Sequence, residues 1–391
     1  MHFLDHCTVQ PAIPAPTGKP APSLQRVLMT ADAIGGIWTY ALELARGLSE
    51  HGIEVVLATM GQPLTVNQRI DAQAIPALAL HESTFRLEWM QDPWEDVERS
   101  GTWLLSLADR FGPDLVHLNG FTHAALPWSR PCLVAAHSCA LSWWQAVRKE
   151  ALPSSFKTYR ERVSEGLTAA GLVTAPSTAM LRSIGALYRP PAMGRVIHNG
   201  RSRGFFEAGK KADFILTVGR LWDEAKNIGA VAKSAGSLPW PIYIAGEQQH
   251  PEGSPVRFNH VRHLGYLPPP RLASWFATAS IYAHPARYEP FGLTVLEAAM
   301  SRCALVLGDI PSLRELWQDA AILVPPDDQE ALAATLTALC RDRQLRERWA
   351  EKAFFRSRSF SVEKMAAGYL DAYASLTGSA AVPERPARKE A

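Results

Sequence analysis

The stretch from Ala283 to Met300 most constrains how this chain can fold. An apolar run ending at Ala283 predicts a buried strand, and the Ala-, Leu- and Met-rich residues 292–300 predict a helix. Pro290 and Gly292 disfavour one continuous helix, because proline lacks an amide donor and glycine favours tight turns. The stretch therefore predicts a strand, a loop and a helix in succession, as in α/β folds.

This strand, loop and helix carry two acids and a predicted anion site. Glu289 lies in the loop and Glu297 on the helix. The first amides of the helix, at Gly292, Leu293 and Thr294, have no acceptor within it, and amides in this position bind phosphates. Two acids beside a phosphate site indicate a sugar nucleotide. An ordinary strand, loop and helix with one solvated acid and one helical acid explains the same spacing.

Apolar runs and helical patterns alternate along the chain in two series, and a length of 391 residues suggests two or three domains. In the first series, strands are predicted at residues 26–30, 54–59, 114–118, 132–136, 172–175 and 195–197, with a helix at 37–49. In the second, strands are predicted at 214–218, 242–245, 261–264, 281–283, 305–307 and 322–324, and helices at 227–235, 271–279, 292–300, 329–340, 344–355 and 362–376. Each series predicts a doubly wound parallel sheet.

A basic loop follows the first strand of the second series. Arg220 and Lys226 lie six residues apart in this loop. Ligands bind at the carboxyl ends of parallel strands, so the two cations are suited to clamp a diphosphate. The alternative is a solvated loop in which they pair with Asp223 and Glu224.

The two glutamates, separated by the seven residues 290–296, resemble the signature of glycosyltransferase family 4. The resemblance covers most of residues 26–376 and implies the GT-B architecture, an α/β fold of two Rossmann-like, doubly wound parallel-sheet domains facing each other across a cleft. The divisions it implies are an acceptor-binding domain at 25–198, a nucleotide-sugar-binding domain at 199–360, and a helix at 361–378 that completes the first domain. The composition of the two ends predicts a disordered extension at 1–24, rich in Pro and Ala, and a flexible polar tail at 379–391.

The resemblance also implies roles for the residues of the second domain. Glu289 would hold hydroxyls of the donor sugar, and Glu297 would hold the ribose of the nucleotide. Arg220 and Lys226 would neutralise the leaving nucleotide. The backbone of Phe291, Gly292, Leu293 and Thr294 would contact the sugar and the phosphates, and Gly265 and Tyr266 are expected near the base.

Three residues of the first domain are assigned in the same way. Gly35 and Gly36 resemble the family's glycine loop at the phosphate side of the cleft; close packing of a helix on a strand is the alternative. His137 follows the strand at 132–136 and resembles a histidine that helps hold the sugar; a structural histidine is the alternative. His117, His198, His263 and His284 are not predicted to be site residues.

Two segments depart from the family pattern. Asn199 and Gly200 resemble the Asn-Gly turn at the end of the first domain, but the acid that usually follows is replaced by Arg201-Ser202-Arg203. The family often has paired glycines where this chain has Gly308-Asp309. No Asp-any-Asp pair occurs in the sequence. We therefore expect no cofactor and a metal-independent reaction, with the two cations and the helix N-terminus in place of a metal.

Composition narrows the classes of molecule that this protein is expected to bind. The formal net charge of +2 does not favour nucleic acid, and no apolar run reaches the ~18 residues that span a bilayer. Five scattered cysteines and the absence of a signal-like start predict a reduced, cytoplasmic protein. Tryptophans of the first domain could line an acceptor pocket, and basic residues at 148–162 could touch an anionic membrane peripherally. Core packing and a solvated helix face are the simpler explanations.

The function expected from these features is a retaining transfer of a sugar from a UDP- or GDP-sugar to a glycan, lipid-linked or small-molecule acceptor. No side chain is an obvious covalent nucleophile, so a front-face displacement in which the donor phosphate helps deprotonate the acceptor is favoured. The alternatives are an epimerase or a phosphorylase on the same fold, and a non-catalytic nucleotide-sugar-binding subunit.

Overall fold

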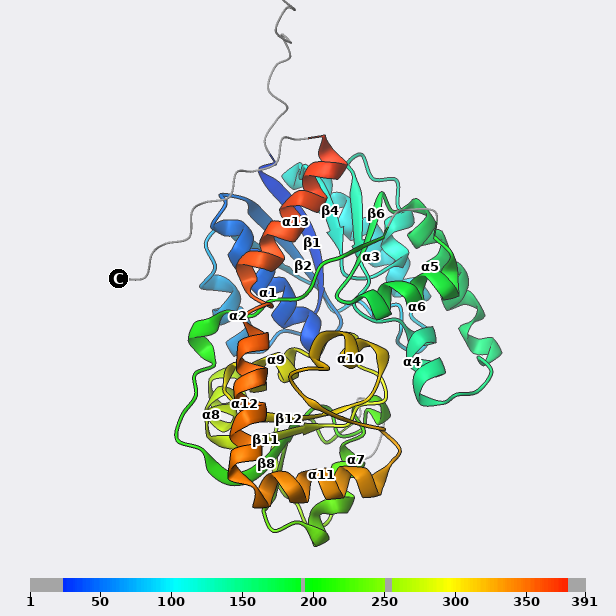
Figure 1. Ribbon diagram of the computed structural model, residues 1–391. Coiled ribbons are helices and arrows are strands. Elements are labelled where there is room, and N and C mark those ends of the chain that lie inside the picture. Colours follow the sequence, from blue (N-terminus) through cyan, green and yellow to red (C-terminus); the bar gives the residue numbers. More distant parts are fainter. Residues whose placement is uncertain (1–23, 191–193, 250–254, 379–391) are drawn as a thin grey trace, which may run out of the picture.

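The computed structural model describes residues 24–190, 194–249 and 255–378. The predicted extension, apart from Leu24, and the predicted tail at 379–391 lie outside the described residues. Leu24 itself is buried in the first core rather than part of a disordered segment. The described residues form two parallel sheets, one above the other in the view of Figure 1, with helices on both faces of each.

The first sheet has seven strands in the order β3-β2-β1-β4-β5-β6-β7, and every pairing is parallel. Its strands are β1 (Arg26–Asp32), β2 (Glu54–Met60), β3 (Leu78–Glu82), β4 (Leu115–Leu118), β5 (Cys132–Ala135), β6 (Leu172–Ala175) and β7 (Gly194–Val196). The helices that accompany them are α1 (Gly36–Ser49), α2 (Val66–Gln73), α3 (Trp94–Phe111), α4 (Ala140–Val147), α5 (Lys157–Ala169) and α6 (Thr178–Tyr188).

The second sheet has six parallel strands in the order β10-β9-β8-β11-β12-β13. Its strands are β8 (Ala212–Val218), β9 (Ile242–Ala245), β10 (Arg262–Gly265), β11 (Ala279–His284), β12 (Ala304–Gly308) and β13 (Ile322–Val324). Its helices are α7 (Ile228–Ser234), α8 (Pro269–Thr278), α9 (Leu293–Met300), α10 (Pro311–Trp317), α11 (Gln329–Arg341) and α12 (Arg343–Ser357). The predicted fold class, two doubly wound parallel sheets, is therefore confirmed.

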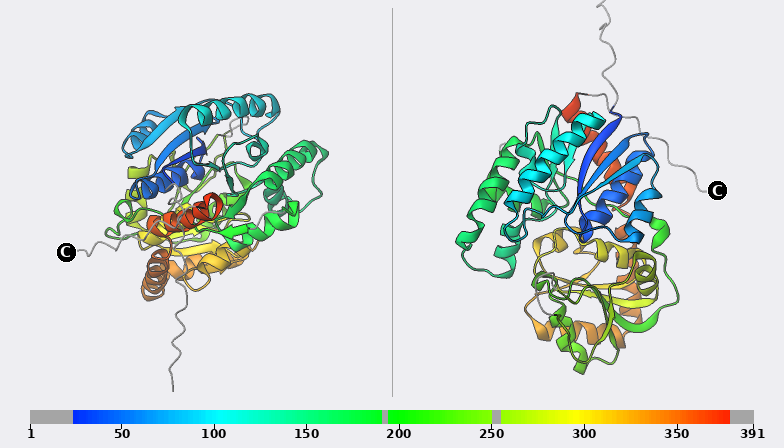
Figure 2. Two further views of the ribbon diagram at one scale, coloured as in Figure 1. Left: turned by 90° about the horizontal axis from the view of Figure 1, so that it is seen from above. Right: turned by 180° about the vertical axis from the view of Figure 1, so that it is seen from behind.

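The last helix returns to the first sheet. α13 (Val362–Thr377) places Met365, Tyr369 and Tyr373 in the core of the first domain and lies beside α1, as two opposite views show (Figures 1 and 2). A Cβ added at Gly47 of α1 would lie only 2.8 Å from the Cβ of Ala366, so the two helices are in close contact. The end of the chain thus links the second domain back to the first.

One strand was missed in the sequence. β3 is an edge strand whose residues are partly or fully exposed, so it has no buried apolar run of the kind that marks the interior strands. The strand order in each sheet reverses beside the first strand, between β1 and β4 and between β8 and β11. Ligands of such sheets bind outside the carboxyl ends of the strands at this point.

None of the helices in the described part of the chain is both long and apolar enough to pass through a bilayer.

Candidate active site

A cavity of about 1020 Å³ lies between the two domains and is lined by loops that follow β1, β4 and β5 of the first sheet and β8, β9 and β11 of the second. It brings together twelve of the thirteen residues predicted from the sequence: Gly35, Gly36, His137, Arg220, Lys226, Tyr266, Glu289, Phe291, Gly292, Leu293, Thr294 and Glu297. Gly265, the last residue of β10, is not among the lining residues.

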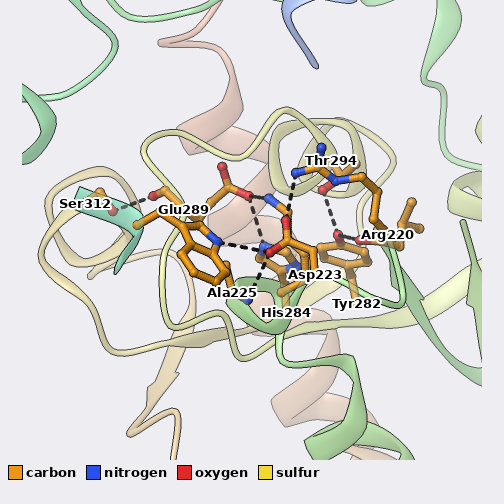
Figure 3. A network of polar contacts seen from close by, with 11 residues as sticks. Arg220, Asp223, Ala225, Tyr282, His284, Glu289, Thr294 and Ser312 are labelled. Atoms are coloured by element: carbon orange, nitrogen blue, oxygen red, sulfur yellow. Dashed lines mark hydrogen bonds and ion pairs between the residues drawn. The ribbon is translucent and has the colours of Figure 1, made fainter. Parts of the chain in front are cut away.

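Glu289 lies at the centre of a polar network (Figure 3). Its Oε2 accepts a hydrogen bond from Nζ of Lys226 at 2.7 Å and lies 3.2 Å from Nε2 of His284, the last residue of β11. Burial raises the pKa of Glu289, but the charge of Lys226 and the hydrogen bond to His284 outweigh it and hold the pKa well below its usual range. The carboxylate is therefore ionised at neutral pH.

The backbone of the loop around Glu289 is fixed by a hydrogen bond and by a glycine. Ser312 Oγ donates to the backbone carbonyl of Glu289 at 2.5 Å. Gly292 has a φ of 88°, and a Cβ there would lie 2.9 Å from Val295 Cγ2, so only glycine fits without strain. Gly292 is the N-cap of α9 and makes no side-chain capping bond, which leaves the first amides of the helix available to a ligand.

The basic loop pairs its two cations differently. Arg220 Nη2 donates to Asp223 Oδ2 at 2.7 Å (Figure 3). The Arg220 guanidinium lies over the ring of Trp222, 4.8 Å from its centre. Burial raises the pKa of Asp223, yet the charges of Lys226 and Arg220 hold it below its ordinary value. The pairing with Asp223 considered as an alternative thus occurs for Arg220, whereas Lys226 pairs with Glu289 inside the cavity.

The glycine loop of the first domain faces these groups. A Cβ added at Gly35 would lie 4.0 Å from Nη1 of Arg220, and one at Gly36 would lie 3.5 Å from Cδ1 of Leu293. Gly35 is the N-cap of α1 and makes no side-chain capping bond. The starts of α1 and α9 therefore approach the same part of the cavity from opposite domains.

His137 lies two residues beyond the last residue of β5, at the carboxyl edge of the first sheet. Its Nε2 lies 2.8 Å from Oδ1 of Asn119, and its ring contacts Tyr40 edge to face at 4.3 Å between ring centres. Burial lowers the pKa of His137 to about 4, so the ring is neutral at neutral pH. By contrast, His117 is fully buried in the core, with Nδ1 2.6 Å from the hydroxyl of Tyr373.

Sequence reasoning missed Asp32, the last residue of β1 at the reversal of strand order. Asp32 lines the cavity, is buried, and its Oδ1 accepts a hydrogen bond from the amide of Ile34 at 2.7 Å. Burial raises its pKa to about 7 against the opposing effects of that hydrogen bond and of the Arg220 charge. An acid at the end of the first apolar run was the signal in the sequence.

Sequence reasoning also set aside His284, which the structure places against Glu289. Its Nδ1 is buried and has no hydrogen-bond partner among the described residues. The available signal was its position as the last residue of a buried strand, five residues before a predicted site glutamate.

Glu297 lies on α9 and is buried. Its Oε1 accepts a hydrogen bond from Nε of Arg201 at 2.8 Å, and Arg201 in turn contacts Glu43 of α1. Arg201 stands in the segment where the sequence departs from the family pattern, so the departure lies at the site itself.

The tryptophans of the first domain divide into those that line the cavity and those that pack elsewhere. Trp89 and Trp143 line the cavity, while Trp94, Trp103 and Trp128 pack against the hydrophobic cores and Trp144 contacts Phe156.

Of the basic residues at 148–162, four form ion pairs: Arg148 with Glu224, Lys149 with Asp327, Lys157 with Glu161, and Arg162 with Glu98. Two of these pairs join the first domain to the second.

In the described ranges, no group of three or more His, Cys, Asp or Glu side chains is arranged to hold a metal ion.

Two facing Rossmann-like sheets with a cavity between their carboxyl edges define a protein of the GT-B class. The chain belongs to glycosyltransferase family 4: residues 34–202 match the family described as Glycosyltransferase Family 4, and residues 201–354 match Glycosyl transferases group 1.

Named relatives agree with this assignment. O-antigen chain mannosyltransferase B of Escherichia coli is 31% identical over 173 residues, which is 41% of this chain and 45% of the relative. The match to a phosphatidyl-myo-inositol mannosyltransferase of Mycolicibacterium smegmatis, 30% identical over 42% of this chain, also spans 45% of the relative. D-inositol 3-phosphate glycosyltransferase of Jonesia denitrificans is 24% identical over 88% of this chain and 92% of its own length. The chain thus matches about half the length of the first two relatives.

Solved structures share the fold. Sucrose-phosphate synthase from Thermosynechococcus elongatus superimposes with a TM-score of 0.74 at 17% identity, over 90% of this chain and 99% of that one. Anabaena HepE in complex with UDP-glucose has a TM-score of 0.72 at 16% identity, over 90% of this chain and 100% of that one.

Proposed function

We propose that the protein is a retaining, metal-independent glycosyltransferase that moves a sugar from a UDP- or GDP-sugar to a glycan, lipid-linked or small-molecule acceptor. One observation carries the proposal. In the cavity, the ionised carboxylate of Glu289 contacts the Lys226 cation beside the uncapped start of α9. A carboxylate accepts hydrogen bonds from sugar hydroxyls, while a cation and free amides bind phosphate.

Each group then has a separate role in donor binding. Glu289 holds hydroxyls of the transferred sugar, and Glu297 holds the ribose. The amides of residues 291–294 bind the sugar and the phosphates. Arg220 and Lys226 stabilise the negative charge that builds on the departing diphosphate, and fixed charges of this kind act most strongly in the transition state.

The transfer proceeds on one face of the sugar. The acceptor oxygen bonds to the anomeric carbon as the bond from that carbon to the donor phosphate oxygen breaks, and the acceptor proton passes to the departing phosphate. The first domain holds the acceptor, with Trp89 and Trp143 as aromatic contacts and Asp32 as a hydrogen-bond partner of an acceptor hydroxyl. His137, neutral and anchored on Asn119, contributes a hydrogen bond to the sugar.

The names of the relatives support sugar or inositol acceptors. They include an O-antigen chain mannosyltransferase and D-inositol 3-phosphate glycosyltransferases. An epimerase or a phosphorylase on the same fold is not favoured, because these relatives are named as transferases.

The proposal is tested by thermal unfolding of the purified protein with UDP, GDP, ADP and their common sugar conjugates, with and without a metal chelator. A ligand that binds only the folded state stabilises it by about 2.7 kcal/mol at a hundredfold excess over its dissociation constant. We expect a chelator-resistant rise in the unfolding midpoint with UDP or GDP, and little rise in Lys226→Met. The absence of a rise with every nucleotide would contradict the proposal, and a rise abolished by the chelator would contradict metal independence.

A further inference from the structure

Arg201 lies in the segment that joins the two sheets, and its backbone and side chain are both fixed. Its amide donates to the carbonyl of Phe360 at 3.3 Å. A Cβ at the preceding residue, Gly200, would lie 2.2 Å from the carbonyl oxygen of Ser361, so this close approach of the two segments requires glycine. The Arg201 guanidinium is buried and lies 4.9 Å from the ring centre of Phe206.

Two glutamates from different domains share this guanidinium. Nε of Arg201 donates to Oε1 of Glu297 on α9 at 2.8 Å, and Nη1 donates to Oε1 of Glu43 on α1 at 2.5 Å. The second oxygen of Glu43 accepts hydrogen bonds from the hydroxyl of Ser202 and from Arg46. Both oxygens of Glu43 are therefore occupied within the protein, and Glu43 does not line the cavity.

Glu297 differs, because it lines the cavity and, among the described residues, only its Oε1 accepts a hydrogen bond. Asn199, two residues before Arg201, also lines the cavity, and its buried Oδ1 has no hydrogen-bond partner in the described part of the chain. Both groups are acceptors, so this corner of the cavity suits a ligand that brings hydroxyl donors.

We propose that Arg201 is a positioning residue for nucleotide recognition: it orients Glu297 so that the second carboxylate oxygen binds ribose hydroxyls, and its contact with Glu43 makes this recognition depend on the first domain. The proposal rests on the proposed function, which assigns a nucleotide-sugar donor. Burial raises the pKa of Glu297, and the Arg201 charge opposes that rise. Arg201 thus also favours the ionised carboxylate, the form that accepts both hydrogen bonds.

The test compares ribonucleotides with deoxyribonucleotides by isothermal titration calorimetry. UDP, GDP and ADP and their 2′-deoxy and 3′-deoxy counterparts are titrated into the full chain. The wild-type protein should bind its preferred ribonucleotide about tenfold or more tightly than a deoxy counterpart, because a hydrogen bond to a charged acceptor has about this effect. Arg201→Gln should bring the ratio close to that of Glu297→Gln, and Glu43→Gln should lower it by a smaller factor.

A matched control separates this effect from a general weakening of the domain interface. Glu315 of α10 accepts hydrogen bonds from the amides of Thr178 and Ala179 at 2.7 and 2.9 Å, and it lies outside the cavity lining. Glu315→Gln should leave the ratio of ribonucleotide to deoxyribonucleotide affinity unchanged.

Three results would overturn the proposal. The first is an unchanged ratio in Arg201→Gln, or in Glu43→Gln if loss of the buried cation prevents Arg201→Gln from folding. The second is an equal fall in Glu315→Gln. The third is a wild-type protein that binds none of the three nucleotides, which overturns the proposed function itself and so is distinguishable from the other two.

Discussion

The two walls of the cleft carry carboxylates, one partly buried and one buried, whose pKa values are displaced in opposite directions. On the second-domain wall, Glu289 contacts Lys226 and His284, and their effect exceeds that of burial and lowers its pKa. On the first-domain wall, burial of Asp32 prevails and raises its pKa to about 7. The same chemical group is thus ionised on one wall and exchanges its proton near neutral pH on the other.

The difference depends on where the neutralising cation lies. Lys226 belongs to the same domain as Glu289 and donates directly to it. The cation that acts on Asp32 is Arg220, which belongs to the opposite domain and donates to Asp223 instead. The second wall therefore has fixed charges suited to hold a donor and stabilise a leaving group, while the first has a group suited to hydrogen-bond an acceptor hydroxyl.

The largest effect is expected from removing the fixed cation. Lys226→Met leaves the partly buried Glu289 carboxylate without its ion pair, which should cost about 1–3 kcal/mol of the free energy of unfolding. Transfer should fall by about 10²–10³-fold, the usual cost of losing one group that stabilises transition-state charge. Chemical denaturation measures the first quantity, and release of nucleoside diphosphate in the presence of acceptor measures the second.

The double variant Lys226→Met/Glu289→Gln is the control for this prediction. It removes both charges, so it should recover most of the stability lost in Lys226→Met but none of the activity. Near-normal turnover in Lys226→Met or in Glu289→Gln would contradict the assignment of the second wall to the donor.

The pH dependence of stability tests the role of Asp32 on the first-domain wall. Its pKa is higher in the folded protein than the ordinary value of 3.8, so the folded state holds this proton more tightly than the unfolded chain. The stabilisation is complete below about pH 4 and is lost as the pH rises through about 7. A displacement of this size corresponds to about 4 kcal/mol, so wild type should lose about that much stability relative to Asp32→Asn between pH 4 and pH 8.

Urea denaturation over this pH range measures the loss, with Glu165→Gln as the control. Glu165 is an exposed carboxylate on α5, and its replacement should leave the difference from wild type nearly independent of pH. Parallel stability curves for wild type and Asp32→Asn would show that the two walls do not differ in the way described.

The contrast between the walls also shows how much of the structure could be predicted from the sequence. Interior strands such as β9 and β6 were predicted to the residue, because a strand buried on both faces needs a continuous apolar run. β13 lies at an edge and was also predicted, from its apolar run Ile322–Val324. β3 was missed, because none of its residues is fully buried and its apolar run is short. The glutamate pair and the basic loop were predicted because their residues lie close together in the sequence or follow predicted strands.

Contacts between distant segments could not be predicted in this way. Arg201 lies 158 residues from Glu43 and 96 from Glu297, and no spacing in the sequence connects them. The raised pKa of Asp32 depends on burial by the assembled domains, and the contact of His284 with Glu289 depends on the path of one loop. Their chemistry is set by tertiary packing rather than by local pattern.

The smallest effect on activity and stability is expected from replacing His284, which contacts Glu289 on the second-domain wall. Its Nε2 lies 3.2 Å from the Glu289 carboxylate, farther than the 2.7 Å of Lys226, and it supports the ionised form mainly as a hydrogen-bond partner. His284→Phe keeps the ring volume and removes this bond, so it should cost about 1 kcal/mol of stability and about tenfold in turnover or less. His284→Gln can still donate and should be closer to wild type. A loss in His284→Phe as large as that in Lys226→Met would mean that the cation alone does not fix the charge of Glu289, and that the donor wall depends on the histidine as much as on the lysine.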